Sequence, residues 1–148
     1  MTSDKTIINA KSILSKSNDE YLLVPNCDAQ VNELIINLSE EVSVEHIVSD
    51  NREDFSASFD EILFYGSSDF PPQNGKWKHI GSIHRPVHGE QQLAVLDKNY
   101  TTDKPMIRYM KVQMRGKENN DLYCTLTHVQ VYGKSMHLSL KESFKNVN

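Results

Sequence analysis

The residues of this chain best suited to chemistry are its two cysteines, Cys27 and Cys124, which lie near opposite ends of the sequence. A cysteine can act as a nucleophile, bind a metal or form a disulfide. A nucleophile needs a base, but on a strand His128 would lie about 13 Å from Cys124, so a direct pair is not expected. A disulfide would stabilise the chain by about 4–5 kcal/mol in the chain-entropy model. From these residues alone the three roles remain open.

The histidines do not form a recognisable metal site. His84 and His88 have helical spacing, but Pro86 lies between them and argues against a helix. The segment 49–54 is rich in oxygen ligands, yet it lacks the twelve-residue spacing and central glycine of a calcium loop. The sequence therefore predicts no metal site built from side chains.

Sequence motifs of common enzyme classes are absent. There is no G-x-S-x-G elbow, no P-loop and no G-x-G-x-x-G. Acidic residues are scattered through turns and do not nominate a catalytic pair. The sequence therefore predicts a non-enzymatic domain. An alternative is a carbohydrate-binding module that uses Trp77, Tyr100 and His88, although Trp77 is expected to pack in the core or at a strand edge.

Length and charge limit the class of protein further. The 148 residues fit one domain, and a net charge of −4 disfavours nucleic acid as a partner. No apolar run approaches the roughly 20 residues that cross a bilayer. The first residues, MTSDK, suggest an expressed fragment. Any membrane attachment is therefore expected through segments outside it.

Two N-x-S/T sequons, at Asn37 and Asn99, could accept N-linked glycans in the secretory pathway. Asn37 falls within a predicted strand and is expected to be a poor acceptor. Asn99 falls in a turn-like loop, which makes it the glycosylation candidate.

Period-two alternation dominates the chain and predicts β-strands. Residues 31–38 and 42–48 read as two strands, and the second places Val42, Val44, His46 and Val48 on one face. In residues 107–114 the alternation places the even-numbered residues on one face.

The predicted fold is all-β. Seven or eight short strands with turn signals between them favour an antiparallel β-sandwich or jelly roll that spans residues 1–148 as one domain. Short helices are expected only near the ends, in residues 10–23 and 137–148.

Six blocks of sequence carry a resemblance to a known family. In order they are DEYLLVPNC, IINLSEEVSVEHI, NREDFSASFDEILFYGSS, KWKHIGSI, IRYMKVQM and LYCTLTHVQVYGKSM. Together they resemble the SUN-like domain, and the most similar branch is the mid-SUN or osteopotentia group of endoplasmic-reticulum membrane proteins. The resemblance covers roughly residues 10–136, which leaves 1–9 and 137–148 as tails.

The resemblance implies a discoidin-like jelly roll of the SUN-domain type in the lumen of the endoplasmic reticulum or nuclear envelope. It implies a disulfide between Cys27 and Cys124 that braces the loop after Cys27. That loop could hold a monovalent cation through backbone carbonyls, and no other cofactor is expected. The implied function is recognition of a protein partner, either a membrane protein or a lumenal client, in the folding or protection of soluble lumenal proteins.

The chain departs from nuclear-envelope SUN domains in ways that bear on the partner. The residues before Cys27 are too few for the long lid that clamps a KASH tail, no coiled-coil heptads are present, and Ser39 replaces a cysteine common in the branch. A KASH-binding domain that links nucleus and cytoskeleton is therefore the alternative. The partner-binding candidates lie around the 50–58 turn and the second cysteine: Asn51, Phe55, Ser56, Tyr123 and Tyr132.

Overall fold

The computed structural model describes residues 2–3, 6–27, 31–53, 56–118 and 123–135. Its elements are β1 (Thr2–Ser3), η1 (Ala10–Leu14), β2 (Leu22–Val24), β3 (Val31–Asp50), β4 (Glu61–Ser67), η2 (Gln73–Gly75), β5 (Lys78–His84), β6 (Gln92–Leu93), β7 (Val95–Leu96), α1 (Lys98–Asp103), β8 (Ile107–Arg115), β9 (Cys124–Leu126) and β10 (His128–Ser135). Among the described residues no helix is long and apolar enough to cross a membrane.

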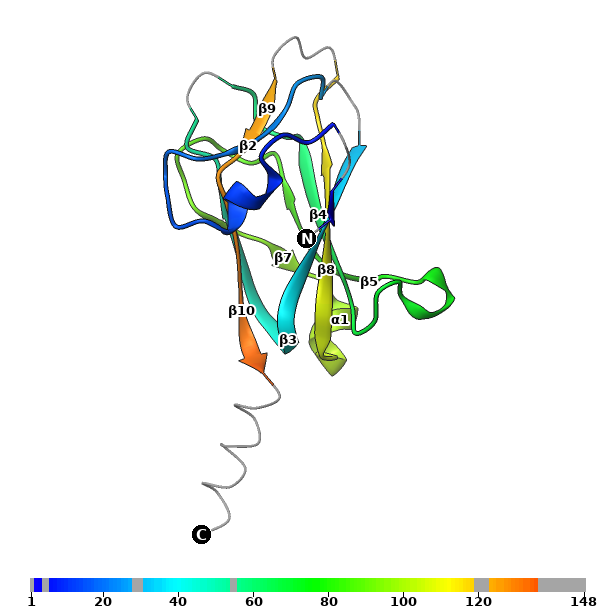
Figure 1. The fold of residues 1–148 in the computed structure, drawn as a ribbon. Helices are drawn as coiled ribbons and strands as arrows, with labels where there is room; N and C mark the ends of the chain where they lie inside the picture. Colours follow the sequence, from blue (N-terminus) through cyan, green and yellow to red (C-terminus); the bar gives the residue numbers. More distant parts are fainter. Residues whose placement is uncertain (1, 4–5, 28–30, 54–55, 119–122, 136–148) are drawn as a thin grey trace.

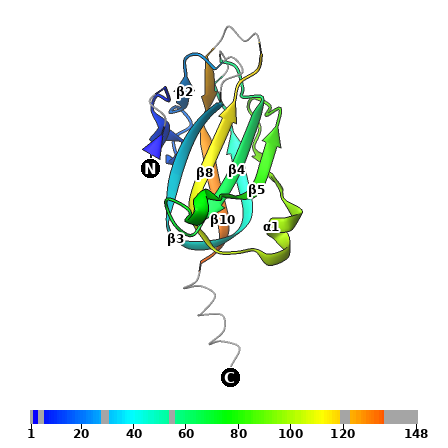
Figure 2. The same ribbon diagram turned by 90° about the vertical axis from the view of Figure 1, so that its right-hand side faces the viewer.

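The strands form the antiparallel sandwich that the alternation predicts (Figures 1 and 2). One sheet follows the order β1-β3-β8-β4-β5-β7, with β10 and β6 also paired to β3. A separate two-stranded sheet, β2-β9, lies beside one end of it. Every pairing between these strands is antiparallel.

Strand β3 bends and contributes to both layers of the sandwich. Its first half pairs with β1 and β8, and its second half pairs with β10 and β6. The register against β8 shifts between Asn37 and Val42, where Ser39 has a φ of 72°. The Ser39 N–H donates to the Asn37 side-chain oxygen at 2.8 Å, which holds the bend. The two predicted strands are thus one bent element, visible as diverging arms in Figure 1.

The prediction that Val42, Val44, His46 and Val48 share one face is wrong in its second half. The pairing of β3 with β10 shifts register between Tyr132 and Gly133, which leaves Glu45 as an extra residue in β3. A one-residue bulge moves the following side chains to the opposite face. Val44 and Ile47 are therefore buried, whereas His46 is exposed.

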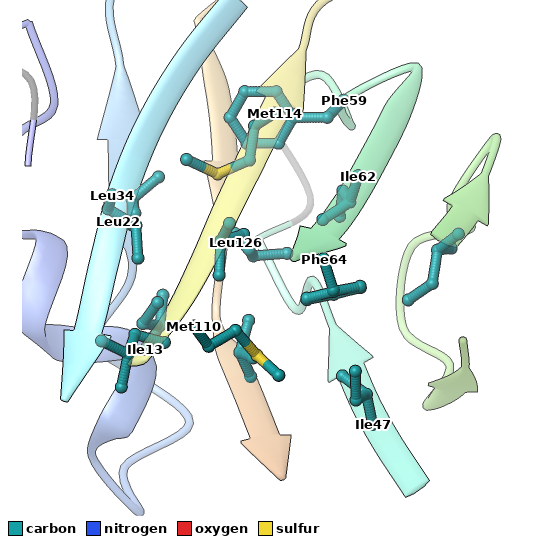
Figure 3. Packing of buried hydrophobic residues seen from close by; sticks show 14 of the residues in the cluster. Ile13, Leu22, Leu34, Ile47, Phe59, Ile62, Phe64, Met110, Met114 and Leu126 are labelled. Carbon is teal, nitrogen blue, oxygen red and sulfur yellow. The ribbon is translucent and has the colours of Figure 1, made fainter. Parts of the chain in front are cut away.

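The core lies between the layers (Figure 3). In β8 the even-numbered residues from Met110 to Met114, which the alternation places on one face, are all buried. At the start of β8 the prediction fails, because Ile107 is buried and Arg108 is exposed beside the β3 bend. Burial of Phe64 and similar large side chains stabilises the fold by about 1.5–3 kcal/mol each.

Helical structure differs from the expectation. Residues 10–14 form only a 3₁₀ turn, and residues 137–148 lie outside the described part. The short helix α1 was not predicted. Its N-cap is Asp97, whose carboxylate accepts the Asn99 N–H at 2.8 Å. A hydrogen bond from His79, together with this capping bond, lowers the pKa of the Asp97 carboxyl.

Candidate functional site

The two cysteines form the predicted disulfide. The Cα atoms of Cys27 and Cys124 lie 5.9 Å apart, and both residues are fully buried. Cys124 begins β9 directly opposite Val24 of β2, so the bond closes the end of the two-stranded sheet. Because each sulfur is bonded to the other, neither cysteine is free to act as a nucleophile.

Gly116 packs directly against the backbone at Cys27. A Cβ atom at position 116 would collide with the Cys27 carbonyl oxygen. The close approach fixes the end of β8 against the disulfide, and the sequence carried no signal for it.

The predicted cation loop after Cys27 falls on residues 28–30, outside the described residues, so the cation stays a prediction.

We expect Gly116→Ala to lower the free energy of unfolding by about 2–3 kcal/mol, because the added methyl group overpacks against rigid backbone. Urea unfolding followed by tryptophan fluorescence measures the change. The control is Gly89→Ala: Gly89 has a φ of 79° but no atom within 4 Å of the added Cβ, so it costs only about 1 kcal/mol of backbone strain. Equal costs at the two positions would contradict a close-packed Gly116.

A buried polar network lies next to the disulfide. The Asn51 side-chain oxygen accepts from the Thr125 hydroxyl at 2.9 Å and from the Glu53 N–H at 3.2 Å. The Ser56 hydroxyl is hydrogen-bonded to that of Thr125, and Ala57 forms a parallel bridge with Cys124. These bonds hold residues 51–53 and 56–57 against β9, and they satisfy the buried polar groups.

The structure brings some of the partner-binding candidates together. Asn51 and Ser56 are buried within the polar network, and Tyr123 lies beside it with its carbonyl accepting the Ala57 N–H. Tyr132 is exposed, but it lies about 13 Å along β10 from His128, so it belongs to another part of the surface. Phe55 lies outside the described residues. Partner contact at each of these residues stays a prediction.

An ion cluster that the sequence did not signal ends β3 beside this network. The Asp50 carboxylate lies 2.7 Å from His128 Nδ1 and accepts from Arg52 Nε at 2.9 Å. The second ring nitrogen of His128 lies 3.0 Å from the Ser17 carbonyl oxygen. The ring thus contacts an oxygen atom through each of its two nitrogens. The cluster fastens the segment around Ser17 to the sandwich.

A groove of about 630 Å³ opens beside the network, lined by Ala57, Ser58, Asp60, Arg85, Pro86, Val87, His88 and Lys117. Ser58 is buried, and its hydroxyl lies 3.4 Å from His88 Nδ1. Arg85 has a φ of 52°, uncommon for a residue with a side chain, and its N–H donates to the Asp60 carbonyl at 2.8 Å. The exposed Arg85 and Lys117 supply two positive charges against the one carboxylate of Asp60 in the lining, and this balance suits a negatively charged ligand group.

The comparisons with known proteins decide the family. The model of the Sad1 / UNC-like C-terminal family matches residues 3–135. The chain belongs to the Sad1/UNC-like (SUN) family. Its relatives include the osteopotentia branch expected from the sequence, since the SUN domain-containing ossification factor of Homo sapiens is 28% identical over 130 residues, covering 86% of this chain and 10% of that protein.

Two further relatives align with this SUN domain. The uncharacterized protein SLP1 of Saccharomyces cerevisiae is 31% identical over 136 residues, covering 90% of this chain and 22% of that protein. SUN domain-containing protein 4 of Arabidopsis thaliana is 29% identical over 134 residues, covering 90% of this chain and 21% of that protein. The SUN domain thus spans about a fifth of the length of these two relatives.

Solved structures share the fold. The C-terminal domain of a chitobiase from Bacteroides fragilis has a TM-score of 0.68 at 17% identity, covering 86% of this chain and 82% of that one. A family 32 carbohydrate-binding module from Clostridium perfringens, in complex with galactose, has a TM-score of 0.64 at 13% identity, covering 88% of this chain and 91% of that one. At such identities the likeness establishes the jelly-roll fold alone.

The aromatic residues of the carbohydrate-binding alternative do not meet in this SUN domain. Tyr100 is fully buried, where burial raises the pKa of its hydroxyl and the Val44 N–H donates to its oxygen. Trp77 and His88 flank opposite ends of β5. Trp77 is half-buried and packs against Phe70, which agrees with the expectation that it packs in the core or at a strand edge.

Proposed function

We propose that this SUN domain is a non-enzymatic protein-interaction domain that works in the lumen of the endoplasmic reticulum or nuclear envelope. The observation that carries the proposal is the family match across residues 3–135. The buried Cys27–Cys124 disulfide supports an oxidising compartment, because such bonds are rare where thiols are kept reduced. The domain would belong to a membrane-anchored protein that assists the folding or protection of lumenal proteins.

The segment before Cys27 favours a partner other than a KASH tail. Its described residues form the two-residue strand β1, the η1 turn and the three-residue strand β2, and not a long lid hairpin. Strand β2 is already paired with β9. A partner that binds in the groove beside the disulfide needs no such lid.

The groove is the surface we assign to the partner. Arg85 and Lys117 lie on its rim, Val87 adds an apolar side chain that is 50% exposed, and Ser58 lies buried in its lining. Such a mixture suits a partner segment with a carboxylate next to an apolar side chain.

Charge reversal in the groove tests this assignment. The full-length parent carrying Arg85→Glu and Lys117→Glu should recover at least about tenfold less partner from detergent-solubilised membranes, because each reversal replaces attraction by repulsion. Quantitative mass spectrometry of the co-purified proteins measures the loss.

The matched control carries Lys78→Glu and Lys98→Glu, two exposed lysines with the same change in charge, outside the groove lining. This variant should retain the partners of the wild type. Equal losses in the two variants would overturn the groove as the binding surface, and unchanged binding in both would do the same.

A further inference from the structure

The bend of β3 presents the sequon Asn37-Leu38-Ser39 on the surface. Asn37 and Ser39 are both exposed, although the sequence places them in a strand. The Asn37 side-chain oxygen accepts the Ser39 N–H at 2.8 Å. Within the described part of the chain, the amide nitrogen of Asn37 has no hydrogen-bond partner. The atom that would receive a glycan is therefore accessible.

An aromatic surface lies beside this sequon. Asn37 is in register with Tyr109 of β8, and because Ile36 and Met110 are buried, both face outward. The ring of Phe70, in the loop between β4 and β5, lies 5.6 Å from the Tyr109 ring centroid. Phe70 is 48% exposed, and its ring also packs against Trp77, so an aromatic surface remains open to solvent here. Figure 2 shows this loop in front of the sheet.

We propose that Asn37 carries an N-linked oligosaccharide whose first sugar packs against Tyr109 and Phe70. The inference rests on the lumenal location proposed above. In a directly opposed strand pair the Cβ atoms lie about 4.5–5.5 Å apart, so the Asn37 amide and the Tyr109 ring are neighbours. A pyranose ring has an apolar C–H face, and an aromatic ring offers a flat apolar surface to it.

The attachment uses a lipid-linked oligosaccharide diphosphate as the donor. The Asn37 amide nitrogen forms a bond to the anomeric carbon of the first sugar. The bond from that carbon to the diphosphate oxygen breaks, the lipid diphosphate leaves, and the amide nitrogen loses one proton. No oxidant or reductant is needed.

The second sequon, at Asn99, has no such exposed aromatic surface described beside it. Asn99 is exposed on α1, but its neighbour Tyr100 is fully buried, and the Thr101 hydroxyl donates to the Lys98 carbonyl at 3.0 Å. Glycosylation of Asn99 stays a prediction, and it provides an internal comparison for Asn37.

Peptide mapping tests the attachment. The full chain is directed into the secretory pathway of cultured eukaryotic cells, and the secreted protein is treated with peptide-N-glycosidase in heavy-oxygen water. Asn37 should gain the heavy-oxygen label, and Asn37→Gln and Ser39→Ala should each lose the mass of one glycan. Secreted, disulfide-bonded protein with unmodified Asn37 would overturn the proposal, whether or not Asn99 is modified.

Thermal unfolding tests the contact with the aromatic surface. The glycan, trimmed to its first sugar, should raise the Tm by about 2–4 °C relative to the Asn37→Gln protein. Phe70→Ser should abolish this gain, whereas Val95→Ser, at a residue that is 73% exposed on β7, should keep it. An equal gain in all three backgrounds would overturn the packing against Phe70.

The peptide-mapping and thermal-unfolding results do not depend on whether the groove binds a partner. Neither experiment contains a partner protein, so loss of the groove assignment leaves them unchanged. If the redirected chain carries the glycan while the protein isolated from its own cells lacks it, the site stands and the lumenal location fails.

Discussion

Replacing Cys27 and Cys124 together by alanine is expected to lower the free energy of unfolding by about 4–5 kcal/mol. The two residues are separated by 97 positions, so their bond removes much of the freedom of the unfolded chain. Since small domains are stable by only about 5–15 kcal/mol, the variant should lose about a third or more of its stability. Urea unfolding at 25 °C measures the difference.

Reduction of the wild-type protein is the matched comparison. Protein treated with a reductant should reach the stability of the double variant, because both lose the same cross-link. A cost below about 1 kcal/mol would show that the cross-link contributes little, and would contradict the disulfide as the main brace of this end of the sandwich.

Asp50→Ala should cost about 3 kcal/mol, because it leaves the buried His128 and its neighbour Arg52 without their shared carboxylate. The Asp50 side chain is 1% exposed, so water cannot replace the lost contacts. Proteolysis near Lys16 should also accelerate, since His128 holds the Ser17 carbonyl. Chemical unfolding and limited trypsin digestion measure the two effects.

Two variants separate the parts of this cluster. Arg52→Ala should cost less than about 1 kcal/mol, because the Arg52 side chain is 39% exposed. Asp103→Ala, at an exposed position on α1, should change stability by no more than about 0.5 kcal/mol. If Asp50→Ala costs no more than Asp103→Ala, the cluster does not fasten the Ser17 segment.

The sequence predicted the structural features that depend on local alternation of side chains along a strand. The alternation placed Met110, Val112 and Met114 on one face of β8, because successive residues of a strand point to opposite faces, and the structure shows that this face is buried. The six family blocks predicted the jelly roll and the Cys27–Cys124 bond, which no local pattern contains. Both predictions are confirmed.

The features that the sequence did not predict depend on contacts between distant segments of the chain. The extra residue at Glu45 exists only because β10 pairs with β3 in a shifted register, and no pattern within 42–48 reveals it. The bond between Asp50 and His128 joins residues that are 78 positions apart. Gly116 likewise looks like an ordinary turn glycine until its contact with Cys27 is seen. The groove is built from such contacts, and Asn51, Ser56, Tyr123 and Tyr132, the described partner-binding candidates from the sequence, do not line it.

The bent strand β3 also sets the order in which the domain can fold. Its first half pairs Val31 with Arg115, and β2 pairs Leu22 with Leu126, so the central pairings must wait until distant segments have been synthesised. Folds dominated by such non-local contacts fold slowly, on a scale of about milliseconds to seconds. During synthesis the unpaired edges of β3 and the thiol of Cys27 stay open to wrong partners. The nascent domain is therefore most exposed to misfolding in the interval before its last strands, β9 and β10, have been synthesised.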